Sequence, residues 1–126
     1  MYVSFSISGV SFDIYSFVSQ TNYFPKDYNV WDEEISEDAT GVTLIFDQSK
    51  PLKPVPFSLG RFLLGNRELL KTHDSSIEKE LTILIEWDIL AAIESNTIFL
   101  YELKPKFMGL LSELGIKLSI TKTIAL

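Results

Sequence analysis

Hydrophobic and polar residues alternate in the first stretch of the chain. Val3, Phe5 and Ile7 are separated by serines over residues 2–8, and Gly9 follows them. A period of two is typical of a strand with one buried face, so this pattern predicts a strand that ends at Gly9. Alternating or continuous apolar residues predict further strands at 42–47, 81–87, 98–101 and 116–124.

Apolar residues with helical spacing predict two helices in the first two thirds of the chain. The first covers about 12–20, and Ser11 is its expected N-cap. The second covers 58–71 and contains Gly60 and Gly65. Glycine inside a helix costs about 1 kcal/mol relative to alanine, so we expect this second helix to be weak.

A third helix has clear signals at both ends. Pro105 suits its first position, where the missing N–H does no harm. Gly115 is the expected left-handed C′ residue, and Ile116 would pack back on Leu111 as in a Schellman cap. The apolar residues expected to face inward from the strand that follows are Ile116, Leu118 and Ile120.

The predicted element order is β-α-β-α-β-β-α-β. Not all of these helices can serve as crossovers between parallel strands, so the order favours the α+β class. We expect a mainly antiparallel sheet with helices on one face, and the pattern leaves the strand order open. At 126 residues, the chain predicts a single domain over 1–126, because a second domain would be too small to have its own core.

Residues 21–40 show no hydrophobic period and are predicted to be a long loop. They contain Pro25 and the aromatic residues Tyr23, Phe24, Tyr28 and Trp31. Long loops in compact domains often carry function. We expect Phe24 to join the core, and Tyr28 and Trp31 to be partly exposed.

The net negative charge of the chain comes from one window between Lys26 and Lys50. The chain has 17 acids and 11 bases, a net charge of −6, and without the seven acids of this window it would have 10 acids and 11 bases, or +1. Such a localised field repels nucleic acid and attracts a basic partner. The seven acids are Asp27, Asp32, Glu33, Glu34, Glu37, Asp38 and Asp47.

Acids and aromatics together predict a protein-binding surface. Tyrosine and tryptophan dominate the hot spots of interfaces, and an acidic rim around them suits a basic partner. Two alternatives without a binding role remain open. In one, the acids form a solvated loop; in the other, the aromatic side chains only fill the core beneath that loop. The predicted partner-binding residues are Tyr28, Trp31, Asp32, Glu33, Glu34, Glu37 and Asp38.

Residues able to carry catalysis are sparse. The chain has no cysteine and one histidine, His73, which lies beside Asp74 in a polar connection. We therefore expect no enzyme, no catalytic residue, no metal site and no cofactor. The alternative is an enzyme or small-ligand domain in which Glu86 or Asp88 would act with His73.

Nothing in the hydropathy suggests a targeting or membrane segment. The first residues have neither a basic region nor a continuous apolar one, and no apolar run approaches the roughly 20 residues that cross a bilayer. These observations predict a cytoplasmic protein that binds neither membrane nor nucleic acid. A monomer is expected, with pairing of copies through an open sheet edge as the alternative.

The two ends of the chain resemble a bacterial family of small domains of unknown function, some of which occur beside polymorphic toxins. The first part of the resemblance is FSISG at residues 5–9, a short helix, and then Phe24-Pro25. The second is LKPKFMGLLSELGIKLSI at 103–120, a helix, a glycine and a strand. The resemblance implies an α+β fold and makes toxin immunity a natural expectation.

This chain also departs from that family. The acidic residues 32–38 replace a basic, glycine-containing turn, and residues 121–124 replace an acidic last strand that ends in tyrosine. The resemblance carries no catalytic residue across. With the acidic window, it predicts an immunity protein that neutralises a basic, nucleic-acid-targeting toxin, such as an effector of contact-dependent growth inhibition.

Overall fold

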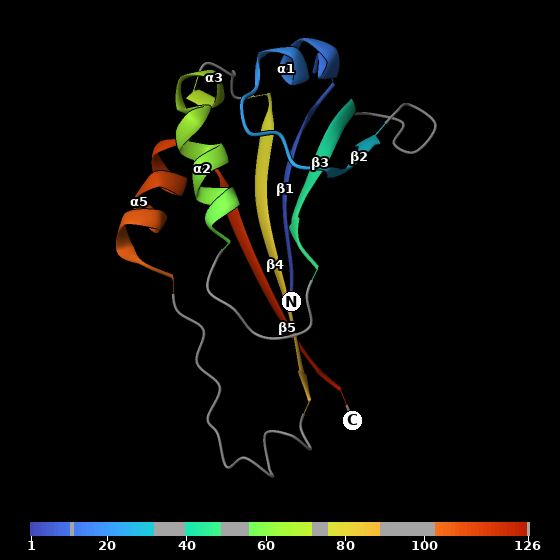
Figure 1. Cartoon of the computed structure of the whole chain (residues 1–126), viewed down its shortest axis with the longest axis vertical. Coiled ribbons are helices and arrows are strands. Elements are labelled where there is room, and N and C mark those ends of the chain that lie inside the picture. The colour runs from blue at the N-terminus through green and yellow to red at the C-terminus, as the bar shows by residue number, and fades with distance from the viewer. Residues whose placement is uncertain (11, 32–39, 49–55, 72–75, 89–102, 126) are drawn as a thin grey trace.

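The computed structural model describes residues 1–10, 12–31, 40–48, 56–71, 76–88 and 103–125 (Figure 1). The described strands form one sheet in the order β2-β3-β1-β4-β5. Every neighbouring pair is antiparallel except β4 and β5, which are parallel. The elements are β1 (Tyr2–Gly9), α1 (Ile14–Gln20), β2 (Asp27–Trp31), β3 (Thr40–Asp47), α2 (Phe57–Gly65), α3 (Arg67–Lys71), β4 (Glu78–Asp88), α5 (Pro105–Glu113) and β5 (Lys117–Ala125).

The predicted α+β class and mainly antiparallel sheet are confirmed, whereas the predicted element order is wrong. The described order is β-α-β-β-α-α-β-α-β. The predicted loop 21–40 contains strand β2, and the predicted helix 58–71 is two helices separated at Asn66. The predicted strand 98–101 lies outside the described residues.

The parallel pairing of β4 and β5 depends on the chain between them. Two parallel neighbours cannot be joined by a tight hairpin and need a long crossover connection. Here that connection contains α5, which Figure 1 shows beside α2 on one side of the sheet. In this register Leu81 pairs with Leu118 and Ile83 with Ile120.

Helix α1 begins later than predicted. Its N-cap is Asp13, whose carboxylate accepts a hydrogen bond from the backbone N–H of Ser16 at 3.0 Å. The expected cap, Ser11, lies outside the described residues. An aspartate cap suits this position because its negative charge also lies at the positive end of the helix dipole.

The predicted Schellman cap of α5 is confirmed. Gly115 has a φ of +65°, and the backbone N–H of Ile116 donates to the carbonyl of Leu111 at 2.9 Å. This cap reverses the chain into β5; Ile116, just before the strand, is buried, and Leu118 within it is partly buried. Ile120 pairs with buried Ile83 and shares the face of Leu118, but it lies on the edge strand and 41% of the residue is exposed.

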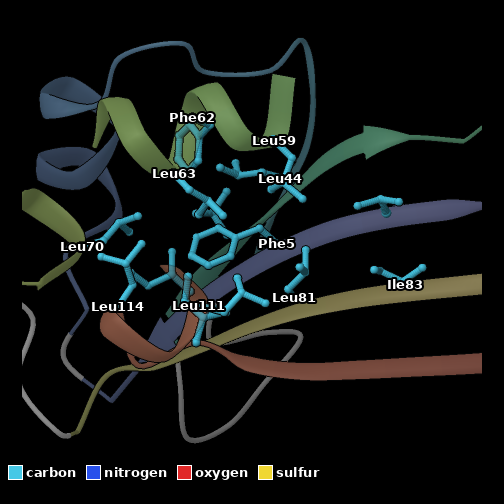
Figure 2. Close-up of a cluster of buried hydrophobic side chains, with 14 of the residues drawn as sticks. Phe5, Leu44, Leu59, Phe62, Leu63, Leu70, Leu81, Ile83, Leu111 and Leu114 are labelled. Carbon is cyan, nitrogen blue, oxygen red and sulfur yellow. The ribbon is translucent and has the colours of Figure 1, made fainter. Parts of the chain in front are cut away.

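The hydrophobic core lies between one face of the sheet and helices α2, α3 and α5 (Figures 1 and 2). Phe62 of α2 is fully buried, and its ring lies 6.0 Å from that of Phe5 and 5.6 Å from that of Phe46. Full burial of such a side chain contributes about 1.5–3 kcal/mol. The helices are therefore fixed on the sheet mainly by apolar contacts from its central strands.

The opposite face of the sheet is polar. Alternation in β1 places Ser4, Ser6 and Ser8 on this face. The hydroxyls of Ser6 and Thr43, a cross-strand pair, lie 3.0 Å apart. The described helices lie on the other face (Figure 1), and from the β2 edge the Trp31 indole reaches the Thr43 hydroxyl.

Candidate partner-binding surface

Strand β2 is one edge of the sheet, and its side chains are largely exposed. It pairs on one side with β3, in a register that opposes Tyr28 to Leu44 and Trp31 to Gly41. Tyrosine, valine and tryptophan favour extended backbone, which explains why so short a segment forms a strand. Among the described strands none lies beyond it, so the backbone groups on the outer edge of β2 have no partner strand in this part of the chain.

Tyr28 lies on the helix-side face of β2, where it is half exposed. Its ring makes an edge-to-face contact with Phe24, with centroids 5.2 Å apart, and 51% of the residue is accessible. Val30, two residues on, is similarly exposed. Phe24 is partly buried and packs against the core, as predicted. Tyr28 and Val30 thus present apolar surface at an edge that the helices do not cover.

Trp31 lies on the polar face of the sheet and is partly buried. Its indole N–H donates to the hydroxyl of Thr43 at 2.8 Å, and that hydroxyl also contacts Ser6. Gly41 is its cross-strand neighbour, and a Cβ there would come within 2.6 Å of the carbonyl oxygen of Ile7. The close approach of β3 to β1 therefore leaves no room for a side chain at the position opposite Trp31.

One row of residues crosses the sheet at this end. Trp31 pairs with Gly41, Gly41 with Ser8, and Ser8 with Glu78. A hollow of about 490 Å³ lies along the row, lined in part by Trp31, Glu78 and Glu80. Glu78 and Glu80 were missed by the sequence reasoning. Their alternation in β4 puts them on the polar face, but their nearness to Trp31 depends on a strand order that the pattern left open.

The structure describes two acids of the window between Lys26 and Lys50, and neither is among the five acids predicted to bind a partner. Asp27 is exposed on β2 and Asp47 is partly buried at the end of β3. Trp31 ends β2 and Thr40 begins β3, so the chain leaves and re-enters the sheet at one corner. The remaining acids of the window lie outside the described residues: Asp32, Glu33, Glu34, Glu37 and Asp38.

Several ionisable groups with shifted pKa values join helix ends rather than forming a reactive site. Hydrogen bonds from Lys71 and Arg67 lower the pKa of Glu113, and the same contact raises the pKa of Arg67. Burial lowers the pKa of Lys79, whose ammonium donates to the carbonyl of Leu70 at 2.9 Å. A second bond, to the carbonyl of Leu114, lets one lysine serve the C-terminal ends of both α3 and α5.

The residues of the enzyme alternative cannot be placed. His73 lies outside the described residues, and so do the side chains of Glu86 and Asp88. Within the described ranges, no three histidine, cysteine, aspartate or glutamate side chains come together as a metal site. In the same ranges, no helix is long and apolar enough to cross a membrane.

Comparison with known proteins adds no relative. No family model, curated protein or solved structure matches the chain. The resemblance to a toxin-associated family therefore stays a prediction. The geometry of the β2 edge and the acids that follow it are the basis for a proposed function.

Proposed function

We propose that this protein is an immunity protein that binds a basic toxin through the β2 surface, which comprises the exposed side of β2 and the acidic segment 32–38 that continues it. The observation that carries the proposal is the position of β2. It is an edge strand, it exposes Tyr28 beside Val30, and it leads directly into the acids. Apolar anchors flanked by charge are the composition expected of an interface with a charged partner.

The charge supports a basic protein partner. Five acids follow Trp31 within residues 32–38, and Glu78 lies on the same row as Trp31. A toxin that acts on nucleic acid is basic at its active site, because phosphate contacts dominate that affinity. An acidic inhibitor can occupy the place of the phosphates and associate fast through electrostatic steering.

The second edge of the sheet is a poorer candidate for the same partner. Strand β5 carries Lys117 and Lys122. Lysines on an edge strand discourage pairing with another chain, and they would repel a basic protein. Strand β2 has no lysine or arginine, so charge selects β2 as the edge for the interface.

Association kinetics test the role of the acids. The partner to try is the protein encoded by the neighbouring upstream gene, with stopped-flow or surface binding at low and high salt. Glu34→Lys should slow association several-fold at low salt and weaken its salt dependence. Glu68→Lys is the matched control: it makes the same change in net charge, from −6 to −4, on exposed helix α3. Equal on-rates for the two variants would rule out steering by the acidic segment.

Dissociation kinetics test the anchor. Tyr28→Ala should speed dissociation and cost about 1–2 kcal/mol of affinity, which is the usual loss for an interface tyrosine. Tyr15→Ala removes a tyrosine from α1 that is even more exposed, at 89%, and should leave both rates unchanged. If the two substitutions behave alike, or if the partner does not bind at all, β2 is not the interface.

A further inference from the structure

A groove separate from the β2 surface lies between α2 and the start of α5. Its volume is about 640 Å³, within the usual range for small-molecule sites. Among the described residues, those that line it include no aspartate or glutamate. They are Tyr23, Pro56, Phe57, Gly60, Arg61, Leu64, Gly65, Leu103, Lys104 and Phe107.

The walls of the groove are apolar and open to solvent. Phe57 is 78% exposed, Leu64 59% and Tyr23 57%. Scattered exposed apolar side chains are ordinary, but several around one hollow mark a binding surface. Gly60 contributes to the floor, and a Cβ built there meets no atom within 4 Å.

Tyr23, which lines one side of the groove, has an unfavourable backbone conformation. Its φ of +59° is uncommon for a bulky residue. Asn66 fixes the preceding residue, because its side chain accepts from the N–H of Asn22 at 2.7 Å and donates to the carbonyl of Asn22 at 2.8 Å. The Tyr23 ring then lies against Gly65, where a Cβ would come within 2.7 Å of it. Strain kept in place by a buried side chain is typical of functional sites.

The groove is also electropositive. The Arg61 guanidinium lies 5.2 Å from the centre of the Tyr23 ring and 5.1 Å from that of Phe57. Among the described residues, no carboxylate pairs with Arg61. Both α2 and α5 start beside the groove and run in the same direction, and neither has a side-chain N-cap (Figure 1). Two positive helix ends and Lys104 therefore add to the charge of Arg61.

We propose that this groove binds a small molecule with an apolar body and one carboxylate. The carboxylate would bind the outer N–H groups of Arg61, which the flanking rings hold in place, near the two helix starts. The apolar body would lie on Phe57, Leu64 and the Tyr23 ring. This site is independent of the proposed toxin contact, because no described residue of the β2 surface lines the groove.

Titration of the ¹⁵N-labelled protein with 4-phenylbutyrate tests the site. We expect saturable shifts of the Gly60 and Gly65 amide signals, which lie on the groove floor. The uncharged 4-phenylbutyramide should bind about tenfold or more weakly, because it cannot make the charge-assisted bonds. Equal binding of acid and amide would overturn the carboxylate assignment, and an absence of saturable shifts up to millimolar acid would overturn the site.

Two matched pairs of variants locate the binding. Gly60→Leu fills open space in the groove and Gly109→Leu fills open space elsewhere on α5, so both should fold and only the first should abolish the shifts. Arg61→Met should weaken binding about tenfold, whereas Lys106→Met, outside the groove, should not change it. Retained binding in Gly60→Leu would place the ligand elsewhere and refute the proposal.

Discussion

Replacing Asn66 with alanine should lower the free energy of unfolding by more than the substitution of one polar residue usually does. Asn66 is 3% exposed, and its amide donates to the carbonyls of Asn22 and Phe62, each at 2.8 Å, while its oxygen accepts from Asn22 at 2.7 Å. A hydrogen bond contributes about 1 kcal/mol net, and the Phe62 carbonyl keeps its backbone bond from Asn66. We therefore expect a loss of about 2–3 kcal/mol, a large share of the roughly 5–15 kcal/mol of a typical domain.

Urea unfolding at 25 °C, followed by tryptophan fluorescence, measures this loss. Asn29→Ala is the control, because Asn29 is exposed on β2, and its cost should be within about 0.5 kcal/mol of zero. If Asn66→Ala costs no more than the control, the hydrogen bonds to Asn22 do not stabilise the fold, and the reasoning is refuted.

Asn66→Asp removes the side-chain hydrogen-bond donor at this position and keeps the acceptor. A carboxylate keeps the acceptor for the Asn22 N–H but faces two carbonyls without a donor, so we expect it to cost more than alanine at pH 7. Burial should raise the pKa of this aspartate above its unfolded value. The folded state then binds more protons than the unfolded state, so the deficit should shrink as pH falls from 7 to 5. A deficit independent of pH would contradict a buried carboxylate.

Three further substitutions test other parts of the fold. Gly60→Ala should raise the free energy of unfolding by about 0.5–1 kcal/mol, because open space surrounds its Cβ inside a helix, and thermal melting would record the gain. Gly41→Ala should lower the melting temperature, because its Cβ would meet the neighbouring strand. Bonds from Lys71 and Arg67 lower the pKa of Glu113 below its usual 4.5, so their contribution is present above that pH and is lost as pH falls through the lowered value. Glu113→Gln should therefore flatten the acid limb of a stability–pH curve, and an unchanged limb would contradict the assignment.

Regular periodicity predicted the parts of the fold where one face is buried. The alternation of β1 and the end signals of α5 are strong because Phe5 and Leu111 must both reach the core. Strand β2 was missed because it is an edge strand with almost no buried residue, so burial imposes no alternation on it. The break between α2 and α3 was not predicted because it lies at Asn66, whose side chain hydrogen-bonds to Asn22, a residue far away in the sequence.

The sequence predicted which types of residue form the candidate surface, but not how these residues lie relative to one another. The exposure of Tyr28 was predicted from its place among acids and loop residues. The support of Trp31 by Thr43, and the row that leads to Glu78, depend on pairings between distant strands. A single sequence does not reveal such pairings, since the same alternation fits several strand orders. The strained Tyr23 likewise has no local signal.

The central position of β1 has a consequence for synthesis of the protein. Both neighbours of β1 follow it in the chain, β3 at Thr40–Asp47 and β4 at Glu78–Asp88. While a ribosome makes the chain, β1 therefore emerges with both edges unpaired and its apolar face uncovered. An open apolar strand is a template for aggregation, and pairing distant strands is slow. The sheet cannot close until β4 has left the ribosome, so we expect the first strand to be prone to aggregation until then.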